Sequence, residues 1–471
     1  MIPVLAFPDI VEHYAPYFRH VFSEEAYIEF KRYVSGLIVG ENKTVEGINR
    51  IMMVESRNQS SLNRLLTESP YSLKALNEAR LEMLASQKGT QMKRKGVLSI
   101  DDTLLKHYGQ KFEHIAKLYD HVTNSYVWAH NLVTLHYSDD YTDYPLLFEL
   151  WKPVDVVKLE AGMRLAGVPI RASKEPLKES DPAKWRSYLV GVWKRRRKSY
   201  PRIKELYATK LDMAQAFLQQ WVDAHPGLKL PVTFDSWYTQ PGFCRFVDET
   251  LGLPYVGTLE TDDVLILKDG KKEVGEFAKQ LKREHLKAVK DGRPPVFKPL
   301  TITYKGKQEQ YYSYCQTHRL RSYGKQRLVI NYRQADLSDN PTCLICNRRR
   351  WQARGITRIR RHRWPVEVYH EEGKDEGLDQ YQLRSFDAIQ RHIALVAVVY
   401  SMLRTAQHDS VLRKQLQRQL EITLDGHPAA LRRAAQAQNL WMLGLFISAG
   451  VAHGHSLSTL IGPLVKAICR A

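Results

Sequence analysis

The run Val97-Leu98-Ser99-Ile100-Asp101-Asp102-Thr103 predicts a buried β-strand that ends in two neighbouring carboxylates. Further strands and helices follow it in an alternating pattern of apolar runs and turn residues. The predicted strands are 126–137, 144–151, 231–234 and 254–259, and the predicted helices are 203–224 and 243–251. The order is therefore β-β-β-α-β-α-β, which is typical of an α/β fold.

A second predicted strand ends in Asp235, and a predicted helix opens just before Glu367. Two-metal phosphoryl transfer needs carboxylates that converge on a pair of divalent cations, and Mg²⁺ prefers such oxygen ligands. Strand side chains alternate between faces, so only one of Asp101 and Asp102 is expected in such a site. An ordinary surface helix with a Glu–Lys ladder explains the helix alone equally well.

Three motifs together resemble the DDE transposases of the IS4 superfamily, including the IS701-like bacterial insertion-sequence group. They are Ile100-Asp101-Asp102-Thr103, Val232-Thr233-Phe234-Asp235, and Arg363-Trp364-Pro365-Val366-Glu367 continuing to Lys374. The last run is similar to the family's Y-x2-R-x3-E-x6-K signature, except that Arg360 stands at the tyrosine position. The resemblance covers roughly residues 95–405. It implies an RNase H-like core, a mixed five-stranded sheet with helices, interrupted by a β-rich insertion.

The resemblance also implies roles for these residues. Asp102, Asp235 and Glu367 would bind two Mg²⁺ ions, which Mn²⁺ can replace, with Asp101 as the alternative first carboxylate. Arg363 and Lys374 would contact DNA phosphate, and Trp237 would stack on a displaced base unless it is a core aromatic. The implied reaction is nicking at the element ends followed by strand transfer into target DNA. The implied partners are the terminal inverted repeats, target DNA and a second copy of the chain in a homodimer.

The charge distribution points independently to nucleic acid. Of 471 residues, 70 are Lys or Arg and 51 are Asp or Glu, which gives a formal net charge of +19. Lys184–Lys210 carries ten basic residues and one acid, and Ile345–Val366 carries eight arginines and no acid, so these segments hold 17 of the 19 charges. Without local acids to pair with, these cations are expected to bind a phosphate backbone, beside aromatic residues such as Trp185 and Trp193. The candidate DNA-binding side chains are Lys194, Arg195, Arg196, Arg197, Lys198, Arg348, Arg349, Arg350, Arg360 and Arg361.

Five regions are predicted along the chain. Residues 1–90 show helical periodicity, with helix starts at Ser23 and Ser72. They would form an N-terminal DNA-binding domain. Within it, the segment Lys43–Leu66 fits either a helix-turn-helix or a generic helical bundle. The other regions are the first part of the core (91–259), the β-rich insertion (260–345), the second part of the core (346–410) and a helical C-terminal region (411–471).

Composition excludes several other classes. The apolar stretches Ile393–Leu403 and Trp441–Ala452 are shorter than the roughly 20 residues of a membrane span and are expected to be buried helices. Five cysteines form no disulfide framework, and no secretory signal is evident, so an intracellular protein is expected. The resemblance implies that it is bacterial, cytoplasmic and nucleoid-associated. The Cys343–Cys346 pair is expected in a buried strand rather than in a zinc site. Two alternatives to a transposase remain: an RNase H-like nuclease without joining activity, and a non-catalytic DNA-binding protein derived from a transposase.

Overall fold

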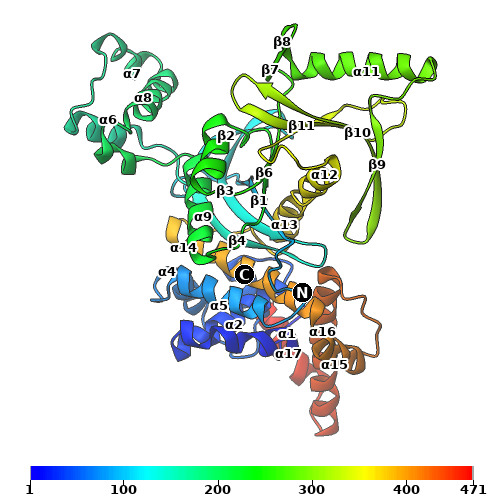
Figure 1. The fold of residues 1–471 in the computed structure, drawn as a ribbon. Helices are drawn as coiled ribbons and strands as arrows, with labels where there is room; N and C mark the ends of the chain where they lie inside the picture. Colours follow the sequence, from blue (N-terminus) through cyan, green and yellow to red (C-terminus); the bar gives the residue numbers. More distant parts are fainter. Residues whose placement is uncertain (1, 469–471) are drawn as a thin grey trace.

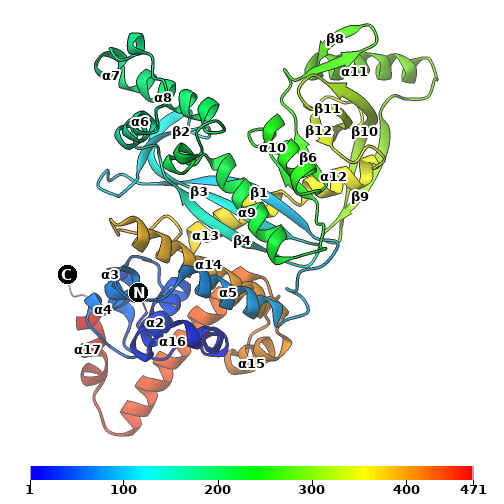
Figure 2. The ribbon, with the colours of Figure 1, turned by 60° about the vertical axis from the view of Figure 1, so that its left-hand side comes forward.

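The computed structural model describes residues 2–468 and confirms a mixed α/β protein built around one large sheet. Figure 1 shows the sheet in the middle of the molecule, with the N-terminal and C-terminal helices together on one side of it. Figure 2 shows the same separation of the helical part from the sheet. Residue 1 and residues 469–471, which include Cys469, lie outside the described part.

Five strands form the centre of the sheet in the order β4-β3-β1-β5-β6, with β2 beside the other end of β3. The pairs β1–β5 and β5–β6 are parallel and the others are antiparallel. The strands are β1 (Val97–Lys106), β2 (Ala116–Asp120), β3 (Ser125–Ser138), β4 (Asp143–Trp151), β5 (Val232–Phe234) and β6 (Tyr255–Thr258). The five-stranded mixed sheet predicted for the core is therefore present, and β2 was missed.

The predicted β-rich insertion continues this sheet instead of forming a separate one. Its last strand, β12 (Thr342–Cys346), pairs antiparallel with β6 and carries β11, β10 and β7 beyond it, so that twelve strands are connected. Cys343 and Cys346 are buried in β12, as expected. The other elements are β7 (Val264–Leu267), β8 (Gly270–Glu273), α11 (Val274–Lys290), β9 (Lys298–Tyr304), β10 (Lys307–Leu320) and β11 (Gly324–Tyr332).

A helical arm that the sequence patterns did not reveal lies between β4 and α9. Figures 1 and 2 show it standing away from the sheet, and it has a hydrophobic core of its own. Trp185 and Trp193 belong to that core and are at most 1% exposed, so the expectation that they face a nucleic acid was wrong. The elements are α6 (Val156–Leu165), η2 (Ala172–Lys174), α7 (Leu177–Ser180), α8 (Pro182–Arg196) and η3 (Pro201–Leu206).

The helix predicted over 203–224 is divided in two. Its first part is the 3₁₀ turn η3, and α9 (Lys210–Ala224) begins after a capping box in which Thr209 and Asp212 bond each other's backbone N–H groups. Such a box satisfies the free backbone N–H groups at the start of a helix. A new helix therefore begins at Lys210 instead of continuing from η3. The arm therefore ends where α9 starts.

The N-terminal and C-terminal helices share one hydrophobic core. The side chains of Ser23 and Ser72 cap α2 and α5, as predicted. The helix α14 (Phe386–His408) has the length and composition of a membrane span. However, 83% of its most apolar 18-residue stretch is buried inside the protein, as in the core helix of a folded domain. The other helices are α1 (Asp9–Tyr14), η1 (Ala15–Val21), α2 (Glu24–Val39), α3 (Val45–Ile51), α4 (Gln59–Thr67), α5 (Leu73–Ala85), α15 (Ser410–Leu420), α16 (Pro428–Ala452) and α17 (Leu457–Ile468).

The two long apolar stretches differ in their burial. Ile393–Leu403 is buried within α14, as predicted. Trp441–Ala452 forms the second half of α16, and much of it is exposed, so the prediction of a buried helix was wrong there. Its surface is considered below.

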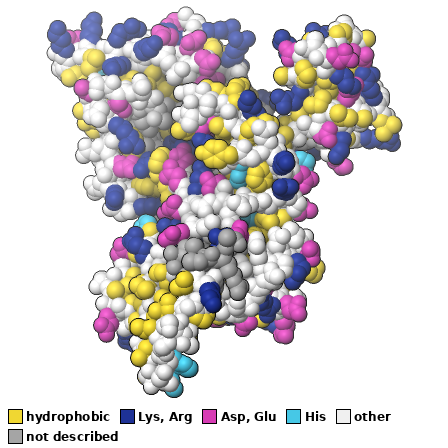
Figure 3. All heavy atoms as spheres, turned by 180° about the vertical axis from the view of Figure 1, so that it is seen from behind, with side chains coloured by type: hydrophobic (Ala, Val, Ile, Leu, Met, Phe, Trp, Pro, Cys, Tyr) yellow, Lys and Arg dark blue, Asp and Glu magenta, His cyan; other side chains and the backbone are white. Residues whose placement is uncertain are grey.

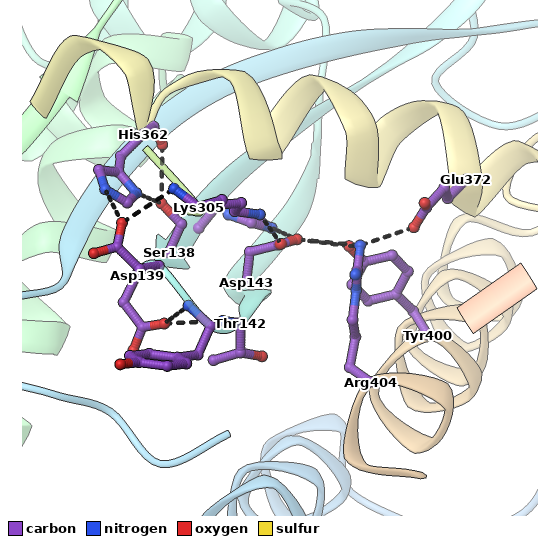
Figure 4. Close-up of polar contacts among 12 residues, drawn as sticks. Ser138, Asp139, Thr142, Asp143, Lys305, His362, Glu372, Tyr400 and Arg404 are labelled. Carbon is purple, nitrogen blue, oxygen red and sulfur yellow. Dashed lines mark hydrogen bonds and ion pairs between the residues drawn. The ribbon is translucent and has the colours of Figure 1, made fainter. Parts of the chain in front are cut away.

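A buried polar network fixes the insertion and two helices to the sheet (Figure 4). Asp143 in β4 accepts from Lys305 Nζ at 2.7 Å and from Tyr400 OH at 2.9 Å, and Arg404 Nη2 lies 3.4 Å away. Arg404 also donates to Glu372 in α13 (Trp364–Asp375) at 2.9 Å. Burial alone would raise the pKa of Asp143, but the cations Arg404 and Lys305 hold it well below its usual range. The network joins β4, the β9–β10 turn, α13 and α14, and so sets the position of α13 against the sheet.

Candidate active site

Asp101 lies in the middle of β1, which continues to Lys106, so the expectation that this strand ends at the aspartates was wrong. Asp235 directly follows β5, and the parallel ladder pairs Ile100 with Phe234, so the two aspartates are at the same level. Residues at the same level of neighbouring parallel strands point to the same face. Both aspartates line a cleft of about 810 Å³, together with Asp102 and Lys374.

Asp101 faces α13 (Trp364–Asp375). It accepts from Arg363 Nη1 at 2.5 Å, and Arg363 also donates to Glu367 one turn later. The β3 residue opposite Asp101 is Thr134, which bonds His370 of the same helix at 3.1 Å. Arg363 therefore joins the carboxylates of β1 and α13.

Asp102 points the other way, toward α9, because neighbouring strand residues alternate between faces. Its Oδ2 accepts from Asn131 Nδ2 at 2.6 Å and from Lys210 Nζ at 2.8 Å. Its Oδ1 accepts from Tyr238 OH at 2.9 Å, and the backbone N–H of Tyr238 donates to Asp235 Oδ1 at 3.1 Å. One tyrosine thus holds both Asp102 and Asp235.

The crowded negative charges change the proton affinity of this site. Burial raises the pKa of Asp101 to about 7; the nearby Asp235 and Asp102 add to the increase, and Arg363 opposes it. Burial also raises the pKa of Asp235, with Asp102 contributing and Arg363 opposing. Carboxylates that repel one another in this way are stabilised by a shared cation.

The donor set fits a hard divalent cation. The Oδ1 atom of Asn131 is buried beside Asp102 without a hydrogen-bond partner, and a buried oxygen of this kind usually marks a place for water or an ion. Within residues 2–468, no three His, Cys, Asp or Glu side chains are arranged as a ready metal site. Arg363 and Lys210 bond the carboxylates instead. Carboxylate and amide oxygens are the ligands that Mg²⁺ prefers.

Lys210, Asn131 and Tyr238 are partners of the acidic cluster that the sequence patterns did not identify as such. Tyr238 directly follows Trp237 in the sequence and is fully buried. Asn131 interrupts the apolar run of β3, which is a weak signal of a buried polar role. Lys210 gives no local signal, because only the fold brings the start of α9 to β1.

Trp237 is the exposed aromatic of the cleft. It is 44% exposed, and Lys210 Nζ lies 4.1 Å from the centre of its ring. Gly373 lies inside α13, and a Cβ atom there would lie 3.2 Å from Leu378. Close packing of α13 against the following turn explains that glycine.

Some of the candidate DNA-binding side chains are exposed, and others form ion pairs within the protein. Lys194, Arg195, Arg196 and Lys198 at the end of α8 are exposed, and Figure 3 shows Lys and Arg gathered on the arm and where it meets the body. Arg197 instead pairs with Asp212 in α9 at 2.8 Å, which fixes this basic end to the helix that carries Lys210.

Four of the eight arginines in the second segment have acidic partners from distant parts of the chain. These pairs are Arg348–Asp248, Arg358–Asp140, Arg361–Glu309 and Arg363–Asp101. The expectation that this segment lacks acidic partners was therefore wrong. Burial lowers the pKa of Arg360 to about 10, whereas Arg349 and Arg350 are exposed.

An open groove beside α12 (Ala353–Arg361) holds other exposed arginines. It has a volume of about 830 Å³ and is lined by the exposed Arg350 and Arg354, by Trp351, and by Arg358 with its partner Asp140. Guanidinium groups on one side of a groove suit a phosphate backbone. This groove and the end of α8 are both basic surfaces of the described chain.

The comparison with protein families gives one match. The model for the "DDE superfamily endonuclease" family matches residues 17–273, which contain Asp101, Asp102 and Asp235 but not Glu367. A search of curated proteins found no match.

Proposed function

Because the chain belongs to the DDE superfamily of endonucleases, we propose that it is a DNA transposase of the IS4 superfamily, similar to the IS701-like group. It would cleave DNA at the ends of an insertion sequence and join the freed ends to target DNA. One observation carries this proposal: the carboxylates of β1, of Asp235 after β5 and of α13 are connected by hydrogen bonds through Arg363 and Tyr238.

The proposed metal ligands are Asp235, Glu367 and one of the two aspartates of β1. The resemblance assigns Asp102 to this role, whereas Asp101 is the aspartate that faces α13 and is joined to Glu367 through Arg363. Mg²⁺ bound to them would neutralise charge at the scissile phosphate and lower the pKa of the attacking hydroxyl. Asp102 is kept as the first candidate because Tyr238 bonds both Asp102 and Asp235, and Asp101 is the alternative. With Asp102 as the ligand, Asp101 would anchor Arg363.

The chain's own cations would position the DNA. Lys374 lines the cleft, and Arg363 lies between two carboxylates, so both are within reach of a phosphate held there. Lys210 would leave Asp102 when the site is loaded and pair with the substrate strand beside Trp237. The free side chains at the end of α8 and in the α12 groove would hold the duplex by its backbone.

The same resemblance supports a homodimer that pairs two element ends, on nucleoid DNA in a bacterial cytoplasm. Mn²⁺ would replace Mg²⁺ in such a site.

The test uses the DNA that flanks the gene on both sides, labelled at its ends. Wild-type protein with Mg²⁺ or Mn²⁺ is expected to nick this DNA and to give a joined product with a target plasmid. Nicking without a joined product would identify a nuclease without joining activity. Binding that does not need metal, with neither nicking nor joining, would identify a non-catalytic DNA-binding protein and overturn the proposal.

A further inference from the structure

The C-terminal hairpin of α16 and α17 exposes an apolar surface that nothing in the described chain covers. The first half of α16 packs on α2, α14 and α15 through buried residues such as Leu431 and Ala435. From Leu440 onward the helix leaves the body, and Figure 2 shows it extending outward before α17 returns. In Figure 3, yellow side chains gather at this lower end of the molecule.

Eight large apolar side chains of this hairpin are between 37% and 56% exposed. They are Leu440, Trp441, Leu445, Phe446, Val451, Leu457, Ile461 and Val465. Together they expose on the order of 700 Å², which is close to the roughly 800 Å² that each partner buries in a standard protein interface. An apolar patch of this size on a soluble protein usually marks an interaction surface.

The charge of the hairpin decides what can cover it. The 32 residues from Ala434 to Val465 contain no Asp, Glu, Lys or Arg, although the whole chain carries +19. The cations of the two helices, Arg432, Arg433 and Lys466, flank this segment, so its apolar side chains have no cation among them to hold DNA phosphates or anionic lipid headgroups. Two copies of so basic a chain repel each other over most of their surface, but an uncharged region escapes that repulsion.

We propose that the hairpin is a homodimer interface and that its occupant is the same hairpin of a second copy. Two helical hairpins that bury their apolar sides against each other form a four-helix bundle around a twofold axis. The basic arm would remain outside this interface, because it lies beyond the sheet from the hairpin (Figure 1). The proposal needs neither DNA nor metal and does not depend on the proposed chemistry.

The test measures molar mass by light scattering and sedimentation, without DNA or metal. Wild-type protein is expected to be a dimer, and the triple variant Leu440→Gln, Leu445→Gln, Ile461→Gln is expected to dissociate with a dissociation constant raised at least about 100-fold. The matched control changes exposed apolar residues of the arm, Val157→Gln and Leu165→Gln, and should stay dimeric. Circular dichroism of all three proteins verifies that they fold.

A second measurement locates the interface. Leu445→Cys is expected to give a covalent dimer with a short bis-maleimide, whereas Leu165→Cys should give only the background of wild type. A monomeric wild-type protein overturns the proposal, and so does a dimer that survives the triple variant and is not cross-linked through position 445.

Discussion

Lys210, the first residue of α9, donates to Asp102 Oδ2 at 2.8 Å across 108 positions of sequence. The ammonium group stands next to the carboxylate that we propose as the first metal ligand. Because the arm ends at the start of α9, and Arg197 of α8 is paired with Asp212 of α9, this contact also connects the basic arm to the cleft.

Replacing this lysine is expected to free Asp102 for a cation. Lys210→Met removes the charge that competes for Oδ2, so Mn²⁺ should bind more tightly, by about tenfold, since about 1.4 kcal/mol corresponds to a factor of ten. Isothermal titration with MnCl₂ measures this directly. The matched control is Lys204→Met, because Lys204 is an exposed lysine of the arm just before α9. Equal affinity in wild type and Lys210→Met would show that the lysine does not compete with metal.

The neighbouring aspartates are expected to differ in their roles. Asp102→Asn should abolish both Mn²⁺ binding and DNA cleavage, because it removes a proposed ligand. Asp101→Asn should retain Mn²⁺ binding and lose cleavage only in part, because it loosens Arg363. The opposite pattern, with metal binding lost in Asp101→Asn and kept in Asp102→Asn, would exchange the two assignments.

The burial of Asp101 predicts a pH dependence of stability. Its pKa is raised to about 7 in the folded protein, so between about pH 4 and pH 7 the folded state retains a proton that the unfolded state has lost. A rise in pH through this window should therefore destabilise wild type relative to Asp101→Asn. Thermal melts of both proteins in EDTA, from pH 4.5 to pH 8, measure the difference; a constant difference in melting temperature would contradict the raised pKa.

The exposed end of α8 is expected to bind DNA through its charge alone. Changing Lys194, Arg195, Arg196 and Lys198 to Gln should weaken duplex binding and lower the salt dependence, by up to about 0.9 in the log–log slope for each lost phosphate contact. Fluorescence anisotropy at several NaCl concentrations measures the slope.

The control for this experiment uses an arginine that forms an ion pair within the protein. Arg361 is paired with Glu309, so Arg361→Gln should lower the melting temperature and leave the salt slope unchanged. A quadruple α8 variant with the slope of wild type would mean that the arm does not hold DNA.

The central elements and the acidic positions could be predicted from the sequence because they depend on local signals. Alternation and turn residues located β1, β3 and β4, and the capping serines located α2 and α5. The acidic positions were visible because they follow apolar runs. Asp101 and Asp102 could not be separated, because local spacing does not show which face of β1 meets which helix.

The remaining features depend on contacts between distant segments. No local pattern showed that Trp185 and Trp193 pack against α6 in a small separate core, so their neighbours on the sequence suggested a DNA surface instead. The acidic partners of Arg358 and Arg361 are 218 and 52 residues away, so a local charge count missed them. The exposure of Trp441 was missed for the same reason: apolar composition predicts burial only when a partner surface is present.

Glu367 lies outside the residues matched by the family model, so it is the member of the proposed triad that most needs a direct test. The measurement is cleavage of end-labelled flanking DNA in Mn²⁺ by wild type and by Glu367→Gln, with Glu371→Gln, an exposed glutamate one turn away, as the control. The proposed site predicts that Glu367→Gln binds DNA with nearly wild-type affinity but cleaves at least about 1000-fold more slowly, while Glu371→Gln cleaves normally. Cleavage by Glu367→Gln at the wild-type rate would contradict the proposed active site.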